Sequence, residues 1–535
     1  MRTTTESSEK TVVGDGRRLL WISVLLLAAG TICSPLFGQQ GRGKPDDWFI
    51  ARTPPATQKP PKMISSAETI MILPGPPACP MSQTERKRPP SPDYLMGKVI
   101  WGQSASFKNA QSLPIKIDDW NLADRDLISL TTMIRPLGFS YHWSHTRLDQ
   151  FDYDPKRLPC LLISGVRELK FPADQIKKLR EYVLGGGMIV CDSVYGSPHF
   201  YESALRVFDT MFPESKFRVI PQDHPLYHIQ VDLDKAAYAC GAKQDKPFLE
   251  GLYVGSRIGV LVSRYGLGCG WEGEMGVFAD LVARGLAPAA YAPQTAKAIA
   301  LNLAAYIIGY ARAGEIEGSP ELFGLPDQKT PTSEFVFAQI KHDGSWNTHP
   351  GAARALLTKL KHESTIPVNL RRVAVDPAQD DLSPYPFLYL TGLDDFSLTP
   401  KAVEKLRDFV RNGGTLFVNN SLGLSTFDRA ARREIARILP ENPLQAVLPT
   451  HPIFRSLQRI GKVQYTATLQ KDKGKELDGR VVLEGIAFGN DLRVIYSPYD
   501  IEAGWNDVYY PLLRGYDNAS AKQIGMNVIA YSMTH

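Results

Sequence analysis

Residues 159–193 read PCLLISGVRELKFPADQIKKLREYVLGGGMIVCDS, and this stretch decides the fold of the chain. Two short apolar runs flank a segment whose apolar residues recur at helical spacing, namely Ile176, Leu179 and Val183. Pro172 is placed to open that helix and Gly186 to end it. A helix between two buried strands predicts a β-α-β unit with parallel strands and a right-handed crossover.

The chain contains this block twice. Residues 159–227 align without a gap onto residues 386–454, at a constant offset of 227, and seventeen of the 69 aligned positions are identical. The second version of the opening stretch reads PFLYLTGLDDFSLTPKAVEKLRDFVRNGGTLFVNN. The block is longer than a solenoid repeat of about 20 to 50 residues, so it predicts duplicated domains. Each candidate residue can therefore be compared with its counterpart in the other copy.

Similar residue groups flank the block in both copies. They are Gly270-Trp271 with Gly504-Trp505 downstream, and Ile115-Lys116 with Ile340-Lys341 upstream. With these landmarks, the sequence predicts two tandem doubly wound, flavodoxin-like α/β domains, at residues 97–313 and 333–535. A linker rich in Gly, Pro and Glu, residues 314–332, separates them.

The N-terminal segment, residues 1–38, has the pattern of an export signal. Two arginines precede an apolar run from Leu19 to Ile32, which suits the core of a signal peptide better than a membrane span of about 20 residues. Cleavage after Gly38 and retention as an uncleaved signal anchor both remain open. Either alternative predicts a protein of the cell envelope whose body is exported, whether periplasmic or anchored to the membrane.

The composition bounds the remaining possibilities. Residues 39–96 contain repeated Pro-Pro pairs and many Lys, Arg, Ser and Thr, which predicts a disordered linker between the membrane end and the first domain. The chain is 43% hydrophobic and 22% charged, as in ordinary globular proteins. A net charge of +5 over 535 residues, with no basic run interleaved with aromatics, gives no indication of nucleic-acid binding.

The cysteines predict no disulfide framework. Five remain after export, all before residue 270, and the second copy has none. An odd number, with no cysteine in the second copy, argues against a disulfide framework, although an oxidising compartment permits disulfides. Cys240 with Cys269 is the most plausible pair.

Polar residues follow the predicted strands at the edge where ligands bind in doubly wound sheets. The candidates for ligand binding are Asp192, Ser193 and His224 in the first copy, and Asn419, Asn420 and His451 in the second. Each histidine precedes a proline. The structural alternative is that Asp192 and Asn419 cap turns through bonds to the backbone, and that each His-Pro pair begins a turn.

Two catalytic or cofactor patterns are weakened by the second copy, and metal-binding motifs are absent from the sequence. Cys191 ends a strand where a nucleophile elbow would lie, with His224 as its base, but the second copy has Val418 there. Residues 268–273 spell G-x-G-x-x-G, whereas residues 502–507 lose the pattern. None of the usual metal-binding motifs appears. The sequence therefore predicts neither a cofactor nor a metal.

The second copy resembles the bacterial domain-of-unknown-function family 4159. The resemblance is carried by Tyr385-Pro386-Phe387-Leu388-Tyr389, Gly413-Gly414, His451-Pro452-Ile453-Phe454 and Gly504-Trp505. The first copy is similar to a more diverged member. The resemblance implies an exported or membrane-associated protein with a fold like class I glutamine amidotransferase domains, and no established activity. Family members usually carry two adjacent aspartates after the Gly-Gly strand, where this chain has Asp192-Ser193 and Asn419-Asn420.

Two functional hypotheses follow. The favoured one is a non-catalytic envelope protein whose tandem domains bind a protein partner or a small ligand, because the copies share glycines, prolines and core positions rather than reactive groups. The alternative is a hydrolase or amidotransferase-like enzyme that works only in the first copy, through Cys191 or Asp192 with His224.

Overall fold

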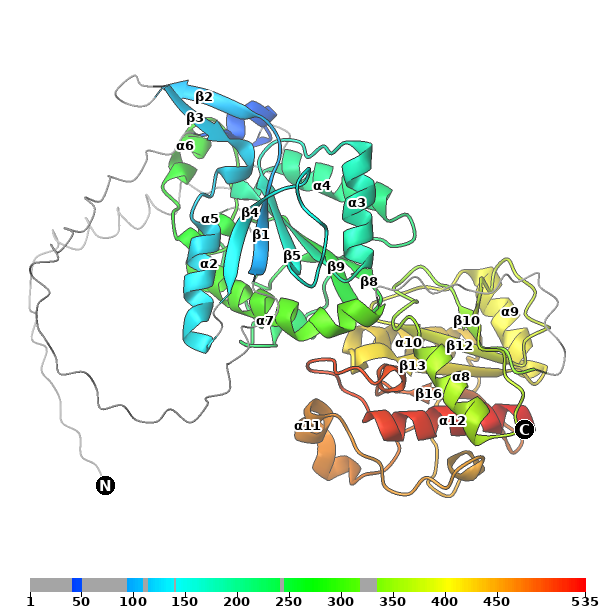
Figure 1. Ribbon diagram of the computed structural model, residues 1–535. Helices are drawn as coiled ribbons and strands as arrows, with labels where there is room; N and C mark the ends of the chain where they lie inside the picture. The colour runs from blue at the N-terminus through cyan, green and yellow to red at the C-terminus, as the bar shows by residue number, and fades with distance from the viewer. Residues whose placement is uncertain (1–40, 51–93, 109–113, 139–140, 241–244, 318–333) are drawn as a thin grey trace, which may run out of the picture.

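The computed structural model describes residues 41–50, 94–108, 114–138, 141–240, 245–317 and 334–535. Two α/β domains of the same topology follow one another along the chain (Figure 1). The tandem α/β organisation predicted from the repeat is thereby confirmed. The predicted export segment, residues 1–38, lies outside the described residues.

The first domain is built on a seven-stranded sheet. Its strands, in spatial order, are β4 (His142–Arg147), β1 (Tyr94–Ile100), β5 (Cys160–Gly165), β6 (Met188–Ser193), β9 (Arg257–Ser263), β8 (Glu250–Val254) and β7 (Arg218–Val219). The first five are parallel, and the last two run antiparallel to their neighbours. The sheet is therefore mixed rather than wholly parallel.

Helices cover both faces of this sheet. They are α2 (Asp126–Ile134), α3 (Ala173–Leu184), α4 (Pro198–Met211), α5 (Gly268–Glu272), α6 (Val277–Ala283) and α7 (Pro293–Glu317), with short 3-10 turns η3 (Asp119–Asn121), η4 (Arg135–Leu137), η5 (Val194–Gly196) and η6 (Pro225–Tyr227). Alternate residues of β5 face opposite clusters: Leu161 packs with α3 and α4, and Leu162 packs with α2 and α7. This alternation makes the domain doubly wound, because every central strand must be apolar on both sides.

The second domain repeats the architecture. Its strands, in spatial order, are β11 (Val373–Val375), β10 (Ala338–Ile340), β12 (Phe387–Gly392), β13 (Thr415–Asn420), β16 (Asp491–Ser497), β15 (Glu484–Phe488) and β14 (Gln445–Ala446). Its helices are α8 (Ala352–Glu363), α9 (Pro400–Arg411), α10 (Ser425–Ile438), α11 (Ala467–Leu477) and α12 (Asn518–Thr534), with 3-10 turns η7 (Ser421–Gly423), η8 (Pro452–Arg455) and η9 (Ala503–Asn506).

The helix predicted in the repeated block forms in both copies, as α3 and α9. Each is followed by a glycine in the left-handed region, Gly186 at φ 111° and Gly413 at φ 96°. Glycine is favoured at such a position because it has no Cβ to clash with the preceding carbonyl.

The two copies differ upstream of their first helix. Ile115-Lys116 lies in β3 (Pro114–Asp118), which pairs only with β2 (Ser104–Lys108) in a separate hairpin. The counterpart of β10 is instead β1, because Gly97 pairs with Leu161 as Ala338 pairs with Leu388. The upstream similarity at Ile115-Lys116 therefore marks a hairpin that the first domain inserts between its first strand and its first helix.

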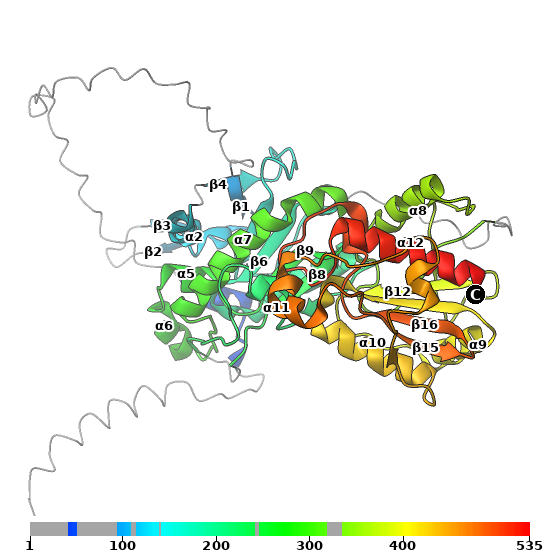
Figure 2. The same cartoon turned by 90° about the horizontal axis from the view of Figure 1, so that it is seen from below.

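The domains contact each other directly (Figures 1 and 2). Helix α7 extends to the second domain, where Tyr310 Oη donates to the carbonyl of Pro511 at 3.1 Å. On the adjoining edge, Arg218 Nε lies 3.7 Å from Asp394 Oδ2. Apolar side chains of both domains join in one buried cluster at this contact.

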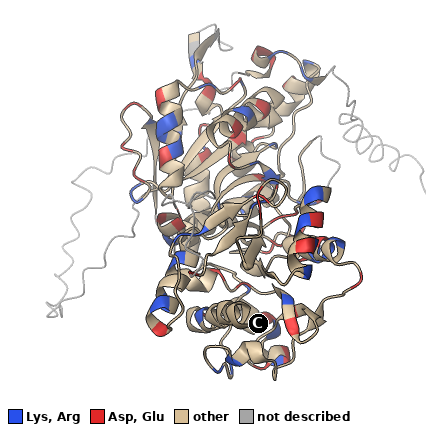
Figure 3. Ribbon diagram, turned by 90° about the vertical axis from the view of Figure 1, so that its right-hand side faces the viewer, with Lys and Arg blue, Asp and Glu red and all other residues tan. Residues whose placement is uncertain are grey.

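Part of the stretch predicted to be a disordered linker, residues 39–96, packs against the first domain. Residues 41–50 contain the 3-10 turn η2 (Pro45–Trp48), and Trp48, Phe49 and Ile50 are buried against the first domain. Elsewhere, acidic and basic residues are interspersed along the ribbon (Figure 3). In the described parts of the chain, no helix is both long and apolar enough to cross a membrane.

Candidate functional site

Asp192, the acidic candidate of the first copy, is the penultimate residue of β6 and is fully buried. Its Oδ1 accepts the N–H of Leu267 at 2.7 Å, and its Oδ2 accepts that of Gly268 at 2.8 Å. Burial raises the pKa of Asp192 to about 7, against the opposing effect of the two N–H donors. Gly268 opens the G-x-G-x-x-G sequence, so a backbone N–H that a phosphate would need there is already bonded to Asp192.

Cys191 and Ser193 flank Asp192 on β6, and both are fully buried. Cys191 belongs to the apolar cluster beneath α3 and α4. Burial raises the pKa of its thiol well above the ordinary value. A thiol held in its protonated form is a poor nucleophile, because the thiolate is the reactive species.

His224 lies beside the amino end of strand β9, whereas Asp192 lies beside the carboxyl end of the same strand. It precedes η6, and its Nδ1 accepts the N–H of Leu226 at 3.1 Å. Its ring packs 5.8 Å from that of Tyr253, whose strand partner is Ile258 near the start of β9. Asp192 pairs instead with Ser263, at the end of β9. The structure therefore does not bring His224 and Asp192 together.

His451 has the same local role in the second copy. Its Nδ1 accepts the N–H of Ile453 at 3.2 Å at the start of η8. Burial lowers the pKa of His451, and it lowers that of His224 to about 3, so each ring is held neutral. The histidine of the shared His-Pro pair thus caps a 3-10 turn in both copies. His451 also borders a surface hollow of about 460 Å³ beside β14 and β15.

The turn after the fourth parallel strand has an unusual backbone in both copies. Tyr195, between β6 and α4, has φ 58°, and Leu422, between β13 and α10, has φ 56°. Residues other than glycine adopt this left-handed backbone region at a cost of about 1–3 kcal/mol. A strained strand-to-helix turn is where a nucleophile elbow places its reactive residue. Here the apex is a buried tyrosine in one copy and a buried leucine in the other.

The second copy keeps a buried carboxylate at this edge, but the residue that carries it, Asp500, lies in the segment that follows β16. Asn419 replaces Asp192, and its Oδ1 accepts the N–H of Ile501 at 2.9 Å while its Nδ2 donates to Asp500 Oδ1 at 3.0 Å. Asp500 Oδ2 in turn accepts the N–H of Leu422 at 2.8 Å. Asn420, the other candidate, donates its Nδ2 to the carbonyl of Pro498 at 3.0 Å. The predicted pair therefore serves to hold turns in place.

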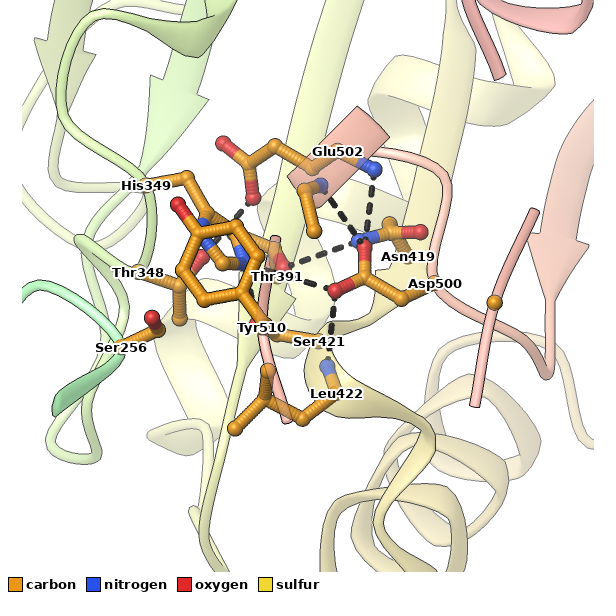
Figure 4. A network of polar contacts seen from close by, with 12 residues as sticks. Ser256, Thr348, His349, Thr391, Asn419, Ser421, Leu422, Asp500, Glu502 and Tyr510 are labelled. Carbon is orange, nitrogen blue, oxygen red and sulfur yellow. Dashed lines mark hydrogen bonds and ion pairs between the residues drawn. The ribbon is translucent and has the colours of Figure 1, made fainter. Parts of the chain in front are cut away.

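His349 is the centre of a buried polar network that joins the domains (Figure 4). Its Nδ1 lies 2.9 Å from Glu317 Oε1, and its Nε2 lies 3.3 Å from Asp500 Oδ2 and 3.1 Å from Ser421 Oγ. The side chains of His349, Glu317 and Asp500 are fully inaccessible to solvent. The carboxylates raise the pKa of His349 to about 10, overcoming burial, which alone lowers it. The ring is therefore an imidazolium at neutral pH.

Glu317 connects this network to the first domain. It ends α7, and its Oε1 also accepts from Ser256 Oγ at 2.7 Å and from Tyr510 Oη at 3.0 Å. Its Oε2 accepts the N–H of Ser256 at 2.9 Å. Because Ser256 belongs to the first domain and Tyr510 to the second, Glu317 is bonded on both sides of the contact.

Glu502 is a second buried carboxyl in the network. Its Oε2 accepts from Thr348 Oγ1 at 2.8 Å, and burial raises its pKa to about 7. Asp500 has its pKa lowered by His349 and Asn419, despite the opposing effect of burial. The two acidic groups thus differ because Asp500 faces the imidazolium directly. Among the described residues, no group of His, Cys, Asp and Glu has the arrangement of a metal site.

Cys240 and Cys269, the most plausible pair for a disulfide, are not bonded to each other in this structure, where both are thiols. Both contribute to the apolar cluster in which residues 48–50 are buried. Cys269 is fully buried in this cluster and Cys240 is half-buried against it, so both pack there without a covalent bridge.

The fold and the site together define a protein of two tandem α/β domains with a buried ionic contact between them. The sequence model of the domain of unknown function DUF4159 matches residues 117–311 and 336–533. The chain therefore belongs to the DUF4159 family and contains two copies of its domain. No curated protein matches the chain.

Proposed function

We propose that this chain is an exported, membrane-associated protein of the cell envelope whose domains bind a protein partner or a small ligand without catalysing a reaction. In finer detail, we propose that each domain is a relative of the flavodoxin-like and class I glutamine amidotransferase-like folds that has kept the scaffold and lost the reactive residue.

The turn at Tyr195 and Leu422 carries this proposal. A hydrolase or amidotransferase of this architecture needs a nucleophile at the apex of the strained turn, where the side chain reaches the substrate. Leucine has no atom that can serve. The Tyr195 side chain is fully buried, so it cannot reach a substrate either. The backbone strain is therefore present in both copies without the chemistry that usually accompanies it.

The contact between Ser421 and His349 supports the same conclusion. Ser421 Oγ, His349 and Glu317 follow each other in the order of a catalytic triad. A general base must however be neutral to accept a proton, and His349 is charged because it lies between two carboxylates. The arrangement is suited to joining two domains.

For binding, the proposal rests on surfaces rather than on the buried candidates. The hollow beside His451 has about 460 Å³, a size that accommodates a small ligand. The apolar N-terminal run and the Pro-Pro pairs that follow it in the sequence support export and tethering near a membrane.

Chemical labelling of the folded full-length chain tests the absence of catalysis. The protein is treated separately with iodoacetamide and with a fluorophosphonate, and labelled peptides are identified by mass spectrometry. We expect no modification of Cys191, Ser193 or Ser421 in buffer, and modification of Cys191 by iodoacetamide in urea. Stoichiometric labelling of any of the three in the folded state contradicts the proposal.

A ligand screen tests the binding role at His451. Thermal unfolding is followed for the parent, for His451→Ala and for His362→Ala, whose side chain is exposed on α8. We expect ligands that raise the melting temperature of the parent and of His362→Ala to lose most of that effect in His451→Ala. Equal stabilisation of all three proteins places the binding site elsewhere.

A further inference from the structure

Residues 41–50 lie on the first domain as a docked peptide. Backbone-to-backbone hydrogen bonds of this segment, among the described residues, stay within it, from Asp47 N–H to Lys44 and from Phe49 N–H to Asp46. It adds no strand to the sheet. Pro45 and the bond from Lys44 N–H to Asp47 Oδ2, at 2.7 Å, set its 3-10 turn locally.

The segment buries three consecutive large apolar side chains. Trp48 and Phe49 are 1% exposed and Ile50 is 5% exposed. They pack on a patch of the first domain that we call the acceptor surface. Its residues are Leu122, Val166, Val194, Tyr195, Cys269, Phe278, Leu281, Leu286 and Ala290. This surface lies over the carboxyl edge of the sheet, since Val166 and Val194 directly follow β5 and β6.

Charged side chains that border the acceptor surface bind the segment near both of its ends. Arg167 Nε donates to Asp46 Oδ1 at 2.8 Å, and its guanidinium lies 4.4 Å from the centre of the Phe49 ring. Arg284 donates to the carbonyl of Asp47 at 3.0 Å. A guanidinium that pairs with a carboxylate and stacks on an aromatic ring is typical of a recognition contact.

At the other end, Arg42 pairs with Glu202 of α4, and His199 Nε2 lies 3.2 Å from the carbonyl of Gly43. The contacts therefore favour a peptide that presents its groups in a specific order. A cation comes first, then an acidic turn, then adjacent aromatic residues.

The second copy shows that this chemistry belongs to the segment rather than to the fold. At the offset of 227, Arg167 corresponds to Asp394 and Glu202 to Arg429, so both charges are reversed. The equivalent surface of the second domain is covered by the first domain, and Arg218 approaches Asp394 there. At the position shared by Arg167 and Asp394, each surface thus carries the charge opposite to that of its own cover.

We propose that the acceptor surface is a peptide-binding site, that residues 41–50 occupy it within one chain, and that the same segment of a second copy can replace them. This inference goes beyond the proposed function, because the acceptor surface lies on the first domain and the hollow beside His451 on the second. The 43 residues from 51 to 93 separate the segment from β1. At full extension they span at most about 150 Å, which is enough to reach a neighbouring molecule.

Complementation between two full-length variants tests the proposal. In Trp48→Ala/Phe49→Ala, the segment is altered and the acceptor surface is intact. In Arg167→Asp, the acceptor surface is altered and the segment is intact. Each variant alone lacks one half of the contact. We expect the mixture to form a one-to-one complex, measured by light scattering after size exclusion, and each variant alone to remain without it.

The matched control is Arg147→Asp, since Arg147 is an exposed arginine that pairs with Asp149 away from the acceptor surface. Mixed with Trp48→Ala/Phe49→Ala, it should bind at least about tenfold more weakly than Arg167→Asp, because its own segment stays bound within the chain. Equal complex formation with both partners, or none with either while circular dichroism shows folded proteins, overturns the proposal.

If Trp48→Ala/Phe49→Ala fails to fold, the proposal is tested by measuring exchange of residues 41–50 in a chain that keeps both aromatic residues. A site-specific protease site is placed within residues 51–93 of the full-length chain. After cleavage, a fluorescent peptide of residues 41–50 should enter the acceptor surface, and the peptide with both aromatic residues changed to alanine should not. A cleaved segment that never exchanges is an integral part of the fold and overturns the proposal. The two proposals fail separately. Labelling of Ser421 or Cys191 in the folded protein would contradict the proposed absence of catalysis, but it would not change the expected exchange of the peptide.

Discussion

Arg167 and Asp394 occupy equivalent positions in the two domains and carry opposite charges, and each pairs with the element that covers its own sheet edge. Arg167 pairs with Asp46 of residues 41–50, and Asp394 faces Arg218 of the first domain. Duplicated domains normally expose the same surface twice. The reversal makes the two surfaces prefer different covers, because a like charge in the same place is repelled.

Reversal of the charge at Asp394 should weaken the contact between the domains. Asp394→Arg places a second cation against Arg218 and also removes the acceptor of the Ser345 N–H, so we expect the free energy of unfolding to fall by about 2–3 kcal/mol. Urea unfolding measures this change. The double variant Arg218→Asp/Asp394→Arg should recover part of it, and Arg147→Asp, at an exposed pair, should cost less than about 0.5 kcal/mol. No recovery in the double variant would show that the charges do not interact.

The sequence predicts the repeated β-α-β block because the information is local. Ile176, Leu179 and Val183 mark one helical face, and Pro172 with Gly186 mark its ends. The same local pattern could not show that His224 and Asp192 lie beside opposite ends of β9. That separation depends on β7 and β8 running antiparallel to the rest of the sheet, which no periodicity in the block indicates.

The network around His349 was not found from the sequence because its members come from five separate segments, near residues 256, 317, 349, 421 and 500–510. Glu317 falls in residues 314–332, which the sequence predicts to be a linker because they are rich in Gly, Pro and Glu. In the structure α7 continues through Gly314, which has no Cβ because the backbone of Gly186 lies against it. One signal was available in the repeat: Asp500 replaces Gly266 where Asn419 replaces Asp192. The paired exchange indicates that a buried carboxylate lies on β6 in the first copy and in the segment after β16 in the second.

Removal of the imidazolium at the domain contact should strongly destabilise the protein. His349→Ala leaves Glu317 and Asp500 buried without their shared cation. Loss of one partner from a buried ionic group costs about 3–5 kcal/mol, so urea unfolding should show a decrease of that size. His362→Ala, on the exposed side of α8, should change the value by less than about 0.5 kcal/mol. A similar small effect at both positions would mean that the network contributes little to stability.

The stability of the folded chain should fall as pH rises. The folded pKa is raised for Asp192 and Glu502, to about 7, and for His349, to about 10. A raised folded pKa gives stability that is complete below the unfolded pKa and is lost as pH rises through the folded value. We therefore expect two losses, one between about pH 4 and 7 from the carboxyls, and one between about pH 6.5 and 10 from the histidine.

Variants separate these two losses in urea unfolding measured across pH. Asp192→Asn should reduce the decline at the lower range, and His349→Gln should remove it at the upper range. Asp500 acts in the opposite sense, because its lowered pKa gives stability that is lost as pH falls below about 4. A profile that is flat from pH 5 to 9 would contradict the assignment of the buried charges.

The arrangement of the second copy should be transferable to the first. Asp192→Asn alone leaves one of the two N–H groups of Leu267 and Gly268 without an acceptor, at a cost of about 1–3 kcal/mol. Asp192→Asn/Gly266→Asp restores a carboxylate where the second domain has Asp500. A Cβ at Gly266 lies 3.1 Å from the nitrogen of Tyr195, so the fit is tight and we expect recovery of about half the loss.

Differential scanning calorimetry at pH 6 compares the two variants, with Gly266→Asp alone as control. That single variant places two carboxyls side by side, so it should be the least stable of the three. If it is instead as stable as the parent, the two carboxyl positions are independent and the exchange between copies has no structural meaning.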